Sequence, residues 1–150
     1  MKTIIRAAAL AATIACGSAG IAQAQTAERV YAQGTVWSVG YIETKPGMFD
    51  DYMAYLNGPW KAIQEAAKKR GDVISYKILS VNDVRDNEPD LVLMVEYKNM
   101  AVFDQSDEEL DKQTSAAFGS PVKANQAAVS RETLRTTRGG FLGRELKFIK

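Results

Sequence analysis

A single carboxylate interrupts a nearly continuous apolar stretch of this chain. The segment "LVLMVEY" (residues 91–97) is typical of a strand that is buried on both faces, except for Glu96. A carboxylate on a buried sheet face has a raised pKa and can act as a general base. The alternative is a cross-strand ion pair with Lys77, which is the commoner reason for such a placement.

A second group of candidates lies in "YLNGPWK", which starts at Tyr55 and places Gly58 and Pro59 inside a helical pattern. Pro59 has no N–H and its ring crowds the carbonyl of Tyr55, so the helix must bend there or split in two. The break sets Asn57 beside the freed carbonyl, and Trp60 continues the apolar side. Such a bend either serves packing alone, which is the usual cause, or lines a ligand cavity with Asn57 and Trp60.

Three aromatic residues on predicted strands complete the candidate pocket. Trp37 and Tyr41 fall on one face of a strand over residues 35–43, and Tyr76 lies in a strand over residues 72–81. Aromatic residues most often serve a core, but Trp37 and Tyr41 can equally line a cavity or a subunit interface. We therefore expect any ligand to be small and apolar or aromatic.

Three arginines, Arg131, Arg135 and Arg138, recur at the spacing i, i+4 and i+7. If residues 121–138 form one helix, the three share a face. Guanidinium groups suit a carboxylate or a phosphate. The commoner alternative is a solvated face near a helix C-terminus, where positive charge is favourable.

The residue types that are missing exclude much chemistry. The chain has no histidine and one cysteine, Cys16, so Ser-His-Asp and Cys-His catalysis are ruled out in their usual form and a structural zinc site lacks its ligands. Removing Lys2 and Arg6 from the 19 basic residues leaves 17 against 18 acidic ones. This near-neutral balance gives no reason to expect nucleic acid as a partner. We expect no metal and no cofactor.

The N-terminus has the layout of a cleavable signal peptide. Lys2 and Arg6 precede an apolar run, and Ala22-Gln23-Ala24 forms a small-residue cleavage site. The run is far shorter than the roughly 20 residues that span a bilayer. We expect cleavage after Ala24, a periplasmic or secreted protein, and no stable membrane insertion. Residues 1–24 are then the signal peptide, residues 25–34 a polar lead-in, and residues 35–150 one domain.

The pattern of apolar and turn residues predicts the order β-α-β-β-α-β. Capping signals split the second helical region, because Ser106 begins a capping box and Ser120-Pro121 restarts a helix after Gly119. The predicted strands are at 35–43, 72–81, 90–98 and within 141–150, most clearly from 144 onward. The predicted helical elements are a bent helix at 48–70, a helical turn at 99–105, and helices at 106–118 and from 121 to 136 or 138, the last stopped by Gly139-Gly140.

This order is the ferredoxin-like arrangement, an α+β fold with a four-stranded antiparallel sheet whose helices cover one face. The other sheet face would then expose many Val, Ile, Leu, Tyr and Trp side chains. Monomers rarely expose so large an apolar patch. We therefore predict a homodimer that pairs two such faces.

The segments "YIETKPGMFDDYMAYLNGPWKAIQEAAKKRG", "ISYKIL" and "LVLMVEYKNMAVFD" resemble the dimeric α/β-barrel superfamily, whose members include the NIPSNAP, EthD and antibiotic-biosynthesis-monooxygenase groups. Within that superfamily, the chain resembles uncharacterised exported bacterial proteins. The resemblance implies a dimeric α/β barrel with a cavity between sheet and helices. Some members oxidise aromatic substrates without a cofactor, with Asn, Trp, Tyr and Arg near the cavity. Asn57, Trp60, Trp37 and Tyr41 are the residues of this chain that could occupy such places.

Three functions remain open on these grounds. The first is an exported homodimer that binds a small apolar or aromatic molecule. The second is an enzyme similar to the cofactor-independent monooxygenases. The third is a non-catalytic interaction module whose sheet face binds a different protein. The residues do not decide whether the chain is an enzyme, and they assign no catalytic residue.

Overall fold

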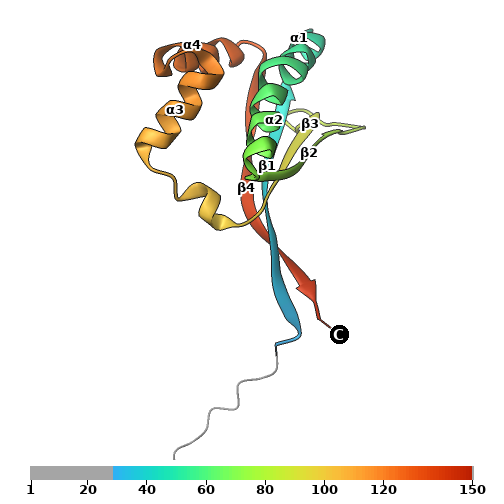
Figure 1. Ribbon diagram of the computed structural model, residues 1–150. Helices are drawn as coiled ribbons and strands as arrows, with labels where there is room; N and C mark the ends of the chain where they lie inside the picture. Colours follow the sequence, from blue (N-terminus) through green and yellow to red (C-terminus); the bar gives the residue numbers. More distant parts are fainter. Residues whose placement is uncertain (1–28, 150) are drawn as a thin grey trace, which may run out of the picture.

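The computed structural model describes residues 29–149, so the predicted signal peptide and its cleavage site lie outside the described residues. The described chain is an α+β fold with a four-stranded antiparallel sheet, as predicted (Figure 1). The elements in chain order are β1 (Tyr31–Thr44), α1 (Phe49–Tyr55), the π-helical turn η1 (Leu56–Trp60), α2 (Lys61–Arg70), β2 (Val73–Ser80), β3 (Leu91–Tyr97), the 3₁₀ helix η2 (Met100–Phe103), α3 (Asp107–Phe118), α4 (Pro121–Arg131) and β4 (Arg135–Phe148).

The strands follow the order β2-β3-β1-β4, and every neighbouring pair is antiparallel. This is the ferredoxin-like order. Ile42 of β1 pairs with Leu91 of β3 on one side and with Thr137 of β4 on the other. Because strand side chains alternate between faces, Ile42 and Leu91 point toward the helices while Trp37 and Tyr41 point away.

The core lies between the sheet and the helical segment α1–η1–α2. Ile42 and Leu91 pack with Tyr52 of α1 and Leu56 of η1, and all four are buried. A second buried cluster is formed by Ala67, Val73 and Val95. Trp60 contacts both clusters, which confirms that the apolar stripe of the predicted helix faces the core.

The predicted bend in this helix is confirmed. Gly58 has φ −97° and ψ −105°, outside the helical region, and Pro59 follows it inside η1. The helix nevertheless resumes at Lys61, whose N–H donates to the carbonyls of Leu56 and Gly58. Because Leu56 and Trp60 both reach the core across the break, one apolar face is kept along both halves.

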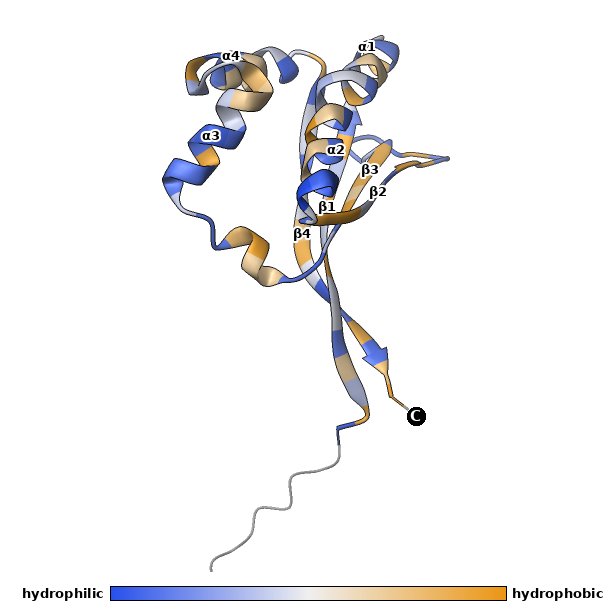
Figure 2. Ribbon diagram, viewed as in Figure 1, coloured by the Kyte–Doolittle hydropathy of each residue, from blue (hydrophilic) through white to orange (hydrophobic). Residues whose placement is uncertain are grey.

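The caps of α3 and α4 are also confirmed. The Ser106 hydroxyl accepts a hydrogen bond from the N–H of Glu109, and the Ser120 hydroxyl accepts one from Lys123. Gly119 ends α3 with φ 85°, a conformation that favours glycine. Neither α3 nor α4 contains a buried residue, and α3 is mostly hydrophilic in Figure 2.

The last part of the chain differs from the prediction. Helix α4 ends at Arg131 rather than at residue 136 or 138, and β4 begins at Arg135 instead of within residues 141–150. Gly139 and Gly140 do not stop a helix, because they lie inside β4. Gly139 has φ 100° at an irregularity in the β1–β4 register, and a side chain on Gly140 would overlap the carbonyl oxygen of Val39. Glycine therefore allows the two strands to approach each other here.

Strand β1 is longer than predicted. It begins at Tyr31, inside the segment expected to be a lead-in, because Tyr31 pairs with Phe148 of β4. The two strands leave the body of the molecule as a twisted ribbon, and the described chain starts and ends at its far end (Figure 1). Several apolar side chains of this ribbon are exposed: Val30, Tyr31, Leu146, Phe148 and Ile149.

Candidate functional site

A pocket lies between the bent helix and strand β2, and we call it the Trp60 pocket. Its volume is about 330 Å³, within the range of small-molecule sites, roughly 300–1,000 Å³. The bend positions its helical wall, since η1 turns Asn57 and Trp60 toward β2. The lining residues are Met53, Leu56, Asn57, Trp60, Lys61, Tyr76 and Ile78.

Two aromatic rings form one side of the Trp60 pocket. The ring centroids of Trp60 and Tyr76 are 5.3 Å apart and the rings are nearly perpendicular at 89°. This edge-to-face geometry is favourable for aromatic pairs. Lys68 adds a cation, with its Nζ 5.6 Å from the centroid of the Tyr76 ring. The wall therefore offers a rigid aromatic surface to a flat apolar molecule.

The polar groups of the pocket are few and partly occupied. The Tyr76 hydroxyl donates a hydrogen bond of 2.7 Å to the Glu65 carboxylate, and this bond raises the pKa of Tyr76. Asn57 Oδ1 lies 3.5 Å from Lys61 Nζ at the rim. An amide and an ammonium group are thus available to orient a ligand, while the phenol stays protonated near neutral pH and is not a base.

The six residues predicted as pocket candidates divide between two faces of the sheet. Asn57, Trp60 and Tyr76 line the Trp60 pocket. Trp37, Tyr41 and Glu96 lie on the face that points away from α1 and α2, which we call the open sheet face. It comprises Trp37, Val39, Tyr41, Leu79, Val92, Met94, Glu96 and Phe141.

Tyr41 is therefore separated from Asn57 and Trp60 by the thickness of the sheet. A single described chain does not bring these three hydrogen-bonding side chains into one cavity. The sequence shows that Trp37 and Tyr41 share a strand face. It could not show which face the helices cover, because that depends on how the strands pack.

The environment of Glu96 differs from both alternatives inferred from the sequence. Its carboxylate accepts hydrogen bonds from the hydroxyls of Ser75, at 2.6 Å, and Thr35, at 2.8 Å. The Ser75 bond is the main reason that the pKa of Glu96 is lowered rather than raised. Lys77 is not its ion-pair partner, and instead lies 5.9 Å from the centroid of the Trp37 ring. Glu96 is thus held ionised and is poorly suited as a general base.

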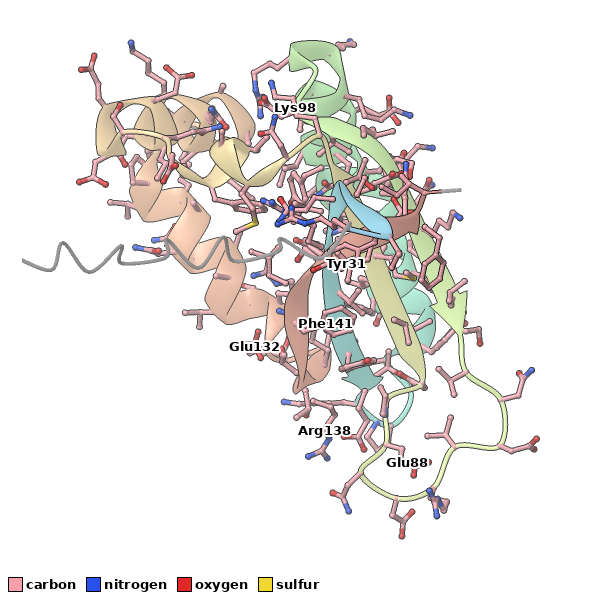
Figure 3. All side chains as sticks on the ribbon, turned by 90° about the horizontal axis from the view of Figure 1, so that it is seen from below. Tyr31, Glu88, Lys98, Glu132, Arg138 and Phe141 are labelled. Carbon is pink, nitrogen blue, oxygen red and sulfur yellow. The ribbon has the colours of Figure 1, made fainter. Side chains whose placement is uncertain are left out.

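The three arginines do not share a helix face, because β4 begins at Arg135. Arg131 donates to the Tyr55 hydroxyl at 2.7 Å. Arg138 pairs with Glu43 and also donates to Asn87 Oδ1 at 3.0 Å. Figure 3 accordingly shows Arg138 at the end of the molecule where the β2–β3 loop carries Glu88. The prediction that the three share a helix face is wrong, because their helical spacing runs across the boundary between α4 and β4.

A second cavity, not predicted from the sequence, lies between α2 and α3. We call it the α2–α3 cleft, and its volume is about 470 Å³. Its floor is made of small apolar side chains, and a hydrogen bond of 3.1 Å from Arg70 to Gln113 closes one part of it. The sequence feature that could have indicated this cavity is the pair of alanines one helical turn apart in α2, Ala62 and Ala66. The lining residues are Pro59, Ala62, Ile63, Ala66, Arg70, Glu109, Lys112, Gln113, Ala116 and Ala117.

Neither a metal centre nor a membrane span is found in the part of the chain that the structure describes. Within residues 29–149, no three His, Cys, Asp or Glu side chains are grouped so that they could hold a metal ion. None of the helices in that range combines the length and the apolar character needed to cross a bilayer.

Comparison with known proteins gives distant structural likeness only. A crystal structure of a protein from Shewanella oneidensis is similar over 80% of this chain and 99% of its own length, with 15% identity and a TM-score of 0.43. A conserved protein of unknown function from Bacteroides thetaiotaomicron, called a possible oxidoreductase, covers 77% of this chain and 99% of its own, with 13% identity and a TM-score of 0.41. No family model matches the chain, and no curated protein matches it.

Proposed function

We propose that this chain is an exported homodimeric protein that binds a small apolar or aromatic molecule in the Trp60 pocket. The observation that carries the proposal is the pocket itself, in which the bent helix and β2 set Trp60 and Tyr76 edge to face beside apolar Met53, Leu56 and Ile78. Ligand sites combine such an apolar lining with a few polar groups. Asn57 and Lys61 supply those groups.

The open sheet face supports the homodimer. It carries Trp37, Tyr41 and Phe141 (Phe141 is labelled in Figure 3), and Phe141 is 52% exposed. The opposite side of β4 is also uncovered, since Leu142 is 46% exposed. A strand that exposes apolar residues on both faces is expected to be covered in solution. The ribbon adds further exposed apolar area, and two-stranded ribbons are marginally stable on their own.

Binding in the Trp60 pocket is tested with N-phenylnaphthylamine, an uncharged aromatic probe whose fluorescence rises on burial. The chain has 2 tryptophans, and Trp37 lies on the open sheet face, which makes a matched pair of variants possible. We expect Trp60→Ala to weaken binding by about tenfold or more, because a contact worth about 1.4 kcal/mol is lost. We expect Trp37→Phe to bind like the wild type. If Trp37→Phe lost binding while Trp60→Ala kept it, the binding site would have to be assigned to the open sheet face instead.

The dimer is tested by size-exclusion chromatography with light scattering on the chain from residue 25 onward. Phe141→Glu places a charge on the open sheet face and is expected to give monomers, because an unpaired charge would be buried in the interface. Val122→Glu alters an exposed apolar residue of α4 instead and is the matched control. A wild-type chain that is monomeric and folded at micromolar concentration would refute the homodimer. The Trp60 pocket would then still be tested by the binding assay alone.

A further inference from the structure

Two arginine side chains meet α1 at the junction between α4 and β4. Arg131 is the last residue of α4 and Arg135 the first of β4, and Figure 3 shows Glu132 at this junction. The backbone fixes the short connection. The N–H of Leu134 donates to the Arg131 carbonyl at 3.1 Å, and the Leu134 carbonyl accepts from the N–H of Lys45 at 2.9 Å. Both guanidinium groups are thereby held beside the tyrosines of α1.

The contacts are specific. Nη1 of Arg131 donates to the Tyr55 hydroxyl at 2.7 Å, and its Cζ lies 5.4 Å from the centroid of the Tyr55 ring. The Cζ of Arg135 lies 5.7 Å from the centroid of the Tyr52 ring. The two rings are stacked, with centroids 5.8 Å apart and an angle of 18° between them. We call Tyr52, Tyr55, Arg131 and Arg135 the Arg–Tyr cluster.

The Arg–Tyr cluster holds more positive charge than its neighbours balance. Glu132 accepts a hydrogen bond of 3.2 Å from Arg135, but its side chain is 54% exposed, so this pair is weak. Arg131 has no carboxylate partner within residues 29–149. The Nε atoms of both arginines are buried and have no hydrogen-bond partner among the described residues. Buried donors are unfavourable unless an acceptor or an anion compensates them.

We propose that the Arg–Tyr cluster binds an oxyanion, the carboxylate or phosphate group of a small molecule. Two guanidinium groups present planar sets of N–H donors that match both groups. The anion would balance the charge of Arg131, which has no carboxylate partner among the described residues, and would offer acceptors to the unpaired donors. Burial raises the pKa of Tyr52, so its hydroxyl stays protonated near neutral pH and is available as a donor.

This anion site is separate from the Trp60 pocket. The two share no residue, because the pocket is lined by Met53, Asn57 and Trp60 and opens toward β2, whereas the Arg–Tyr cluster lies next to β4. The inference therefore goes beyond the proposed function, and an uncharged probe of the Trp60 pocket does not test it.

The test is thermal unfolding of the chain from residue 25 onward with inorganic phosphate or with benzoate, each compared with sodium chloride at equal ionic strength. We expect a saturable rise in Tm with at least one of the two anions, since a ligand that binds only the folded state stabilises it. The anion that gives the larger rise identifies the group. Arg131→Gln and Arg135→Gln should remove the rise, while Arg138→Gln, which loses contacts to Glu43 and Asn87, should keep it.

A milder variant keeps the proposal testable if an arginine variant does not fold. Tyr55→Phe removes only the hydroxyl that positions Arg131, and we expect it to weaken anion binding by about tenfold without loss of the fold. A rise in Tm that is equal in sodium chloride, or that persists unchanged in both Arg131→Gln and Arg135→Gln, would overturn the proposal.

Discussion

The two helical layers of this chain differ in what holds them in place. The first, α1–η1–α2, buries Tyr52 and Leu56 against the sheet. The second, α3–α4, buries no residue, although both of its helices begin with a serine N-cap. Caps and turn residues thus define where α3 and α4 begin and where α3 ends. They do not attach these helices to the core, because attachment requires burial of apolar surface.

The largest expected effect comes from the packed layer. Leu56→Ala removes a side chain that is 1% exposed, and should lower the free energy of unfolding by about 2–5 kcal/mol, since a cavity is left in the core. Leu110→Ala in α3 is the control, because Leu110 is 47% exposed, and should cost less than about 1 kcal/mol. Urea denaturation at one fixed protein concentration measures both. Equal losses would show that α3 is buried in solution after all.

The next prediction contrasts the weakly attached second layer with β4, the strand that follows it and pairs closely with β1. Gly140→Ala in β4 should destabilise the chain by about 1–3 kcal/mol, because the added methyl group overlaps the Val39 carbonyl oxygen and must push β1 and β4 apart. Its pairing partner Gly40 has open space at the corresponding position. Gly40→Ala is therefore the matched control, and an equal loss in both variants would argue against close approach at Gly140.

Glu96 lies on the open sheet face, which neither helical layer covers. Hydrogen bonds from Ser75 and Thr35 lower its pKa below the ordinary value of 4.5, so ionised Glu96 stabilises the fold. That contribution is present above pH 4.5 and is lost as the pH falls through the lower pKa of the folded protein. We expect Glu96→Gln to be about 1 kcal/mol less stable than the wild type at neutral pH, and the gap to close in acid. A gap that does not change with pH would contradict this.

The smallest expected effect lies within the second layer. Ser106→Ala removes the N-cap of α3 and should cost that helix about 1 kcal/mol. Because α3 contributes no buried residue, the global free energy of unfolding should fall by less than this. Hydrogen exchange is the appropriate measurement: amide protection should drop in α3 and stay unchanged in α1 and α2. A matching drop in α2 would mean that the two layers unfold together.

Local chemistry explains which parts of the fold could be predicted from the sequence. Ser106, Ser120 and Gly119 act through bonds to residues a few positions away, and the break at Gly58-Pro59 follows from the missing proline N–H. These features were predictable because no distant residue decides them.

The α4–β4 boundary was not predictable in the same way. The segment from Arg131 to Arg138 carries helical spacing, yet Thr136 and Thr137 pair with Glu43 and Ile42 of β1. Long-range pairing with β1 favoured a strand over the helix that the arginine spacing indicates. The β-branched threonines were the one local sign of a strand. The same limit applies to the candidate residues, since packing of the helices on one face separated Asn57, Trp60 and Tyr76 from Trp37, Tyr41 and Glu96.

Strand β4 also forms a long border of the sheet. It spans 14 residues and, within residues 29–149, lies beside β1 on one side only. An unpaired row of backbone amides and carbonyls is a template for aggregation. The two irregularities in its register and the charged side chains of Arg138, Arg144 and Lys147 interrupt that template. The glycines that bring β4 close to β1 therefore also help to keep unrelated chains from adding to this border.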